Sequence, residues 1–234
     1  MVTFMRFTID FCRSGFFILL ILLIASCGLE TFYYLDPPLA DAEIANPEDP
    51  AERVFTFKTA KIIDSADIFK GTSVYYRLYN SFSAMTSNRS TIANINEEYS
   101  DAAMNRMLSL GFQPISVDDI ELVSTKEDGS VTVQIRLFNE NIYKAEVIVG
   151  GDNKGEPLRM PIRKGFSFYP VEEETEDEYP VPTSDDEDTN YSSDGGDTWY
   201  VLAYAVTVGT SLELTPIYSQ VTPLGYLAVE PDSQ

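Results

Sequence analysis

The chain has 234 residues, with 37 acidic and 16 basic side chains, a formal charge of −21 and no histidine. Without histidine there is no Ser-His-Asp triad, no Cys-His pair and no imidazole ligand for a metal. A charge this negative repels phosphate backbones, so nucleic acid is disfavoured as a partner. The length suits one or two domains, and an apolar share of 44% is ordinary for a globular chain.

Residues 1–26 are predicted to be a secretory signal peptide. Arg6 and Arg13 lie in a short basic region, which is followed by the apolar run 16–25 and then by Ser26 and Cys27. A basic region, an apolar core and small residues at the break are typical of such a peptide. The apolar run has 10 residues, whereas a membrane-spanning helix needs about 20, so a permanent transmembrane helix is disfavoured.

The sequence Ile24-Ala25-Ser26-Cys27 resembles the lipobox of bacterial lipoproteins. The resemblance implies cleavage between Ser26 and Cys27, transfer of lipid to the Cys27 thiol, and acylation of the new amine with a fatty acid such as palmitate. The membrane is then a partner through the lipid on Cys27. The alternative is an ordinary signal peptide with a cysteine nearby. Gly28 stands where many inner-membrane lipoproteins carry a retaining Asp, which favours the outer membrane of a bacterial cell envelope.

Residues 27–52 are predicted to be a lipid-anchored tether. Pro37, Pro38, Pro47 and Pro50 fix φ and remove backbone donors, so we expect a semi-extended spacer that lifts a domain off the bilayer. Residues 28–38, Gly-Leu-Glu-Thr-Phe-Tyr-Tyr-Leu-Asp-Pro-Pro, resemble the start of uncharacterised spirochaete lipoproteins. That resemblance implies a lineage and no activity.

Residues 53–230 are predicted to form a β-rich domain, because apolar and polar residues alternate with a period of two. Asp128-Gly129 indicates a hairpin that pairs residues 121–124 with the strand starting at Val131, and residues 150–155 are expected to form a turn. Pro216 and Pro223 make the last two segments edge or broken strands. The segment 198–208 is nearly all apolar, so we expect it to be a central strand. The predicted strands are 54–58, 71–79, 131–138, 143–149, 165–169, 198–208, 214–221 and 226–229.

A helix is predicted over Ser100–Gly111, within an insertion at about residues 83–115. Its apolar residues Ala103, Met104, Met107 and Leu108 share one face, with Ser100 as the N-cap and Gly111 just past the end. We expect this face to pack in the core, with the helix covering one end or edge of the β domain.

Two segments, Phe69–Leu78 and Tyr200–Val206, resemble the C and F strands of a fibronectin type III or related immunoglobulin-like sandwich. The resemblance implies a mainly β fold, an immunoglobulin/fibronectin III-like β-sandwich. The one short inserted helix and the disordered acidic loop predicted for this chain are departures from that family. Such domains mostly act in adhesion, spacing or scaffolding.

Residues 171–197 hold 12 acids and no base, so a disordered, solvated loop is predicted. Within this loop, oxygen ligands recur at the spacing of a calcium-binding loop, although Tyr191 replaces its glycine and no flanking helices appear. Weak condensation of Ca²⁺ is favoured over a specific site, and no other cofactor is predicted. The candidate ligands are Asp186, Asp188, Asn190, Asp194 and Asp197.

The favoured function is a non-catalytic binding, spacing or structural module anchored at the cell envelope. Tyr75, Tyr79 and Trp199 are candidate contacts to an unknown protein or envelope partner, against the alternative that they pack across strands. Two other hypotheses are a calcium-responsive surface protein that uses the acidic loop, and a carboxylate-dependent hydrolase of envelope glycans. No nucleophile elbow, zinc pattern or phosphate loop supports an enzyme.

Overall fold

In this computed structural model, the described part of the chain comprises two β-sheets and two helices. It covers residues 34–40, 52–61, 68–115, 121–124, 130–139, 144–155 and 182–229. The predicted signal peptide, Cys27 and the strand predicted at residues 165–169 lie outside these residues.

The smaller sheet has four antiparallel strands. Their spatial order is β1 (Val54–Lys58), β5 (Thr132–Asn139), β6 (Lys144–Val149) and β7 (Asp152–Gly155). The turn after β6 consists only of Gly150-Gly151. Their φ angles of 60° and 91° suit a tight hairpin turn, and glycine adopts such positive φ angles easily. Residues 152–155, predicted to belong to that turn, instead form β7.

The larger sheet has seven strands and is built on the long strands β2 (Phe69–Tyr79) and β9 (Trp199–Thr210). These two are antiparallel neighbours, with Tyr79 opposite Tyr200 and Phe69 opposite Gly209. The central position predicted for β9 is therefore confirmed. The short strands β3 (Gln113–Pro114), β4 (Val123–Ser124) and β8 (Thr189–Asn190) pair with β2, whereas β10 (Pro216–Tyr218) and β11 (Thr222–Val229) pair with β9.

Two details of strand pairing test the turn predictions. Among the described strands, β10 and β11 pair only with β9, and the β11 register shifts between Pro223 and Gly225, so the edge or broken character that the prolines predicted is confirmed. The hairpin predicted at Asp128-Gly129 is wrong, because β4 pairs with Gly71 and Thr72 of β2 while β5 pairs with β1 and β6. A local turn signal cannot reveal that a more distant strand competes for the same partner.

The two sheets pack face to face on one apolar core, as expected for a sandwich of two layered sheets. Alternate residues of each strand point into this inter-sheet core, because side chains in a strand alternate between its two faces. The core includes Phe55 and Phe57 of β1, Val133 and Ile135 of β5, Val147 and Val149 of β6, Val74, Tyr76 and Leu78 of β2, and Val201, Ala203 and Ala205 of β9.

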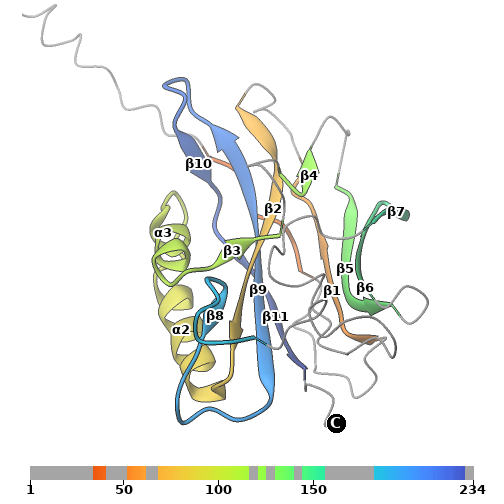
Figure 1. Cartoon of the computed structure of the whole chain (residues 1–234). Coiled ribbons are helices and arrows are strands. Elements are labelled where there is room, and N and C mark those ends of the chain that lie inside the picture. The colour runs from red at the N-terminus through yellow and green to blue at the C-terminus, as the bar shows by residue number, and fades with distance from the viewer. Residues whose placement is uncertain are drawn as a thin grey trace, which may run out of the picture. The chain divides into compact units, whose positions relative to one another are not determined.

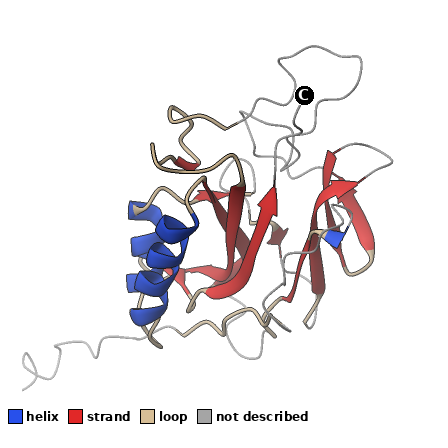
Figure 2. Ribbon diagram, turned by 90° about the horizontal axis from the view of Figure 1, so that it is seen from below, coloured by secondary structure: helices blue, strands red, loops and turns tan. Residues whose placement is uncertain are grey.

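Two helices cover the other face of the larger sheet, so the described residues form three layers (Figure 2). The helix α3 (Ala102–Ser109) confirms the helix predicted over Ser100–Gly111, and its Ala103, Met104 and Met107 are buried against the sheet. Two details of that prediction are wrong: Leu108 is exposed, and the N-cap is Asp101 instead of Ser100. The expectation that the helix covers an end or edge is also wrong. Leu202, Tyr204 and Val206 of β9 belong to this second, helix–sheet core.

The longer helix α2 (Phe82–Asn94) was not predicted, and the description of one short inserted helix is therefore wrong. Its sequence is rich in Ser, Thr and Asn and shows little apolar periodicity, and only Met85 and Ile92 are buried. Ser81 caps it by accepting a hydrogen bond from the Ala84 amide at 3.4 Å.

Candidate functional site

The lipidation candidate Cys27 lies outside the described residues, but the structure shows where the following chain meets the body. We call Tyr34–Ala40 the docked segment. The Tyr34 ring lies 5.0 Å from that of Tyr99, and Leu35 is only 4% exposed. Further along, Thr207 donates a hydrogen bond to the Asp36 carbonyl at 2.6 Å, and Thr222 donates one to the Pro38 carbonyl at 2.5 Å.

The docked segment changes the expected tether. Leu39 and Lys58 exchange backbone hydrogen bonds of 2.9 and 2.7 Å, which ties the segment to the end of β1. Its prolines do exclude regular structure, as expected, yet the segment lies on the body and is no free spacer. The other parts of the predicted tether, residues 27–33 and 41–51, lie outside the described residues.

The second half of the acidic loop is ordered, contrary to the prediction of disorder. We call the described residues 182–197 the acidic segment. Its strand β8 runs parallel to the end of β2, and Leu78 donates a backbone hydrogen bond to the Asp188 carbonyl at 2.9 Å. The Tyr76 hydroxyl donates to the Asp188 carboxylate at 2.7 Å, and Asp188 is 5% exposed. A buried polar anchor therefore offsets the repulsion among the acids.

Asn80, just past the end of β2, holds the acidic segment at further points. Its side-chain amide donates to the Ser192 carbonyl at 2.9 Å and accepts from the Ser192 amide at 2.7 Å. Its own carbonyl accepts from Gly196 at 3.0 Å. A Cβ at Gly195 would overlap the Asn80 side chain, so this close approach requires glycine. In the sequence of this segment, the glycine pair Gly195-Gly196 is the feature that could have indicated such a close approach.

The five candidate calcium ligands are not gathered at one point. The Asp186 carboxylate accepts from the Thr183 amide at 2.9 Å and from its hydroxyl at 3.2 Å, while the Asp188 carboxylate accepts from Tyr76. Asn190 pairs with Tyr79 in the sheet, and Asp194 and Asp197 are exposed in the following turns. Across the described ranges, no three acidic or cysteine side chains form a group that could hold a metal ion.

Beside the acidic segment, the pKa values of Arg77 and Tyr79 are shifted from their usual values. Arg77 donates to the Thr189 carbonyl at 2.8 Å, and its guanidinium lies so close to Gly111 that a Cβ there would overlap it. Burial lowers the pKa of Arg77, while the nearby Tyr79 and Asp188 act in the opposite direction. Burial raises the pKa of Tyr79 above its usual 10.0, opposed by a hydrogen bond from Asn88 and by the charge of Arg77.

The raised pKa of Tyr79 predicts a loss of stability in alkali. The neutral phenol is favoured in the folded state, so this stabilisation is complete below the unfolded pKa of about 10 and disappears as pH rises through the folded pKa. Within that window, wild type should lose up to about 1.4 kcal/mol per pH unit relative to Tyr79→Phe. Urea unfolding of both proteins from pH 8 to 11 measures this difference, and parallel pH profiles would contradict the prediction.

The three candidate partner contacts differ in exposure. Tyr79 is 0% and Trp199 4% exposed, so both rings belong to the cores, as the alternative of cross-strand packing expects. Tyr75 is partly buried against the helix–sheet core. The aromatic surface instead lies at the start of α2, where Phe82, 46% exposed, stacks edge-on with Tyr200 at 5.3 Å and Tyr226 at 5.5 Å.

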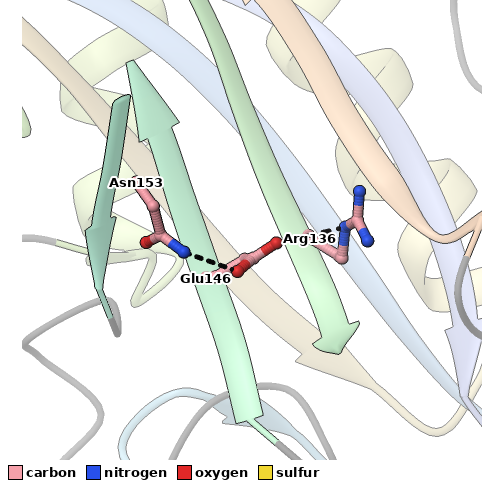
Figure 3. Close-up of polar contacts among 3 residues, drawn as sticks. All are labelled: Arg136, Glu146 and Asn153. Atoms are coloured by element: carbon pink, nitrogen blue, oxygen red, sulfur yellow. Dashed lines mark hydrogen bonds and ion pairs between the residues drawn. The ribbon is translucent and has the colours of Figure 1, made fainter. Parts of the chain in front are cut away.

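A second buried carboxylate lies in the smaller sheet, where three neighbouring strands bring polar side chains together (Figure 3). Glu146 of β6 accepts from the Asn153 amide of β7 at 2.8 Å and pairs with the Arg136 guanidinium of β5 at 3.5 Å. A hydrolase of the predicted kind needs two carboxylates on either side of one bond. Glu146 lies in the smaller sheet, whereas Asp188 directly precedes β8 of the larger sheet. Each carboxylate is held by neighbouring side chains.

Comparison of the chain with protein-family models, with curated proteins and with solved structures finds no match. In the described part of the chain, neither helix is long and apolar enough to cross a membrane.

Proposed function

We propose that this protein is a lipid-anchored module of the bacterial cell envelope, held by lipid on Cys27 and acting by binding, spacing or scaffolding without catalysis. The observation that carries the proposal is the lipobox Ile24-Ala25-Ser26-Cys27 at the end of an apolar run. Gly28 in place of the retaining Asp favours the outer membrane.

The docked segment supports a particular form of this proposal. Only Gly28 to Tyr33 separate Cys27 from the first residue of the docked segment, and Leu35 is buried in the body. A lipid on Cys27 would therefore hold the body close to the bilayer and would leave little free spacer. Two or more acyl chains make such an anchor stable, because one chain alone binds reversibly.

The pairing of β2 with β9 supports an immunoglobulin-like arrangement of the sandwich. The segments that resemble strands C and F are antiparallel neighbours, and the next long strand, β11, lies on the other side of β9. The helical layer over this sheet is a departure from that family, whose sandwich has two layers. Fold alone does not fix the function, and the scaffold role rests mainly on the proposed anchor.

The anchor is tested by changing each of the 2 cysteines in turn. Cys27→Ala should abolish incorporation of a fatty-acid label and processing of the signal peptide, because the thiol that receives the lipid is gone. Cys12→Ala is the matched control and should be labelled and processed like wild type. Expression of the full chain in a two-membrane bacterium, followed by labelling and mass spectrometry of the N-terminal peptide, measures both. Label that persists in Cys27→Ala would refute the proposed anchor.

A further inference from the structure

The hairpin that joins β9 to β10 projects from one end of the larger sheet (Figure 1). Two exposed leucines lie at its tip. Leu212 is 79% and Leu214 84% exposed, the highest values among the large apolar side chains of the described residues. Burying a leucine is favourable and exposing it is not. Two leucines at one projecting tip therefore point to a partner that covers them.

The hairpin tip is held in a defined conformation. The Ser211 amide donates to the Thr215 carbonyl at 2.8 Å, and the two hydroxyls of these residues lie 2.6 Å apart. The Ser211 hydroxyl also accepts from the amides of Glu213 and Thr215, each at 3.2 Å. Leu214 has a φ of 63°, a left-handed conformation that residues other than glycine rarely adopt. The tip is thus preorganised with its leucines exposed.

The docked segment reaches the body at the base of the same hairpin. A Cβ added to Gly209 would lie 3.0 Å from the Leu35 side chain and 3.1 Å from that of Ile217 in β10. The chain from Cys27 to Leu35 can span at most about 28 Å, and Leu212 lies three residues beyond Gly209, about 10 Å along the strand. Lipid on Cys27 and the hairpin tip can therefore reach one bilayer surface.

The acidic segment lies at the other end of the larger sheet. It is attached beside Leu78 and Tyr79, opposite the start of β9, whereas the hairpin follows the end of β9 at Thr210. Strand β9 has 12 residues and spans about 35 Å, several times the screening length of about 8 Å at physiological salt. A bilayer at the hairpin tip would thus meet the end of the sheet that is remote from the acidic segment.

We propose that the β9–β10 hairpin tip is a second membrane contact, in which Leu212 and Leu214 enter the interfacial region of the bilayer that holds the lipid anchor. This inference rests on the proposed function, because the anchor supplies the nearby bilayer. The leucines supply the attraction to the bilayer. Anionic headgroups would weaken it, because Glu213 lies between the leucines and is repelled by negative charge. The anchor and the tip together fix the orientation of the body, with the acidic segment directed away from the membrane.

Two matched tryptophan variants of the full, lipidated chain test the contact. Leu212→Trp places a reporter at the tip, and Phe82→Trp places one on an exposed aromatic at the opposite end of β9, while Trp199 is buried in both. Each protein is reconstituted into phosphatidylcholine vesicles whose acyl chains carry bromine. Interfacial segments lie about 5–10 Å into the headgroup region, so we expect about twofold quenching for Leu212→Trp and almost none for Phe82→Trp. Adding anionic lipid should weaken the quenching.

The mass of the N-terminal peptide separates the two proposals. A protein that carries lipid on Cys27 but shows equal quenching in both variants overturns the tip contact and leaves the anchor intact. A protein without lipid on Cys27 overturns the proposed function, and the tip contact then falls with it. Selective quenching of Leu212→Trp in the lipidated protein supports both.

Discussion

Replacing Asp188 with alanine is expected to lower the free energy of unfolding by about 3 kcal/mol and to release the acidic segment. The substitution removes the carboxylate that accepts a hydrogen bond from the hydroxyl of Tyr76, a residue that is 1% exposed. It also removes the negative charge that lies near the half-buried Arg77. Urea unfolding measures the stability, and hydrogen exchange across residues 182–197 measures the release. The matched control is Glu187→Ala, which removes the same charge from an exposed neighbour and should cost less than about 0.5 kcal/mol.

A double-mutant cycle identifies the source of the loss. In a Tyr76→Phe background the hydroxyl is absent, so removing Asp188 should cost about 1–2 kcal/mol less than in wild type. Additive effects of the two substitutions would show that the hydrogen bond between Tyr76 and Asp188 does not hold the segment. If Asp188→Ala is as stable as Glu187→Ala, the burial of this carboxylate has no energetic role.

The strands with clear alternation could be predicted because each carries its own signal. Phe55 and Phe57 in β1, and Val133 and Ile135 in β5, repeat with a period of two and are all buried in the inter-sheet core. The helix α3 shows its Met104 and Met107 at helical spacing in the same way. In each case the local pattern and the tertiary environment favour the same structure.

The acidic segment and the docked segment could not be predicted, because their order comes from distant residues. Asn80 and Ser192 are 112 positions apart, and Asp36 and Thr207 are 171 apart. The composition of such segments shows only what opposes their order: repulsion between acids in one segment, and the missing backbone donors of proline in the other. The compensating partners lie in or just after β2 and in β1, β9 and β11, and no local pattern in residues 34–40 or 182–197 identifies them.

Replacing Phe57 with alanine is expected to lower the free energy of unfolding by about 3–5 kcal/mol, the largest effect predicted for this chain. The Phe57 ring is 0% exposed in the inter-sheet core, so the substitution removes apolar contacts and leaves a cavity. Phe82→Ala is the control, since this side chain is 46% exposed, and it should cost less than about 1.5 kcal/mol. Urea unfolding of the three proteins measures the difference.

The loss should appear in all three layers at once. Strand β9 places Val201 and Ala203 in the inter-sheet core and Leu202 and Tyr204 in the helix–sheet core, so the larger sheet cannot lose one face and keep the other. Fluorescence of Trp199 reports the inter-sheet core, and hydrogen exchange in α3 reports the helical layer. Both should move to lower urea together in Phe57→Ala. Separate transitions would mean that the helices and the larger sheet fold independently of the smaller sheet, and a rigid body oriented by the anchor and the hairpin tip would then be excluded.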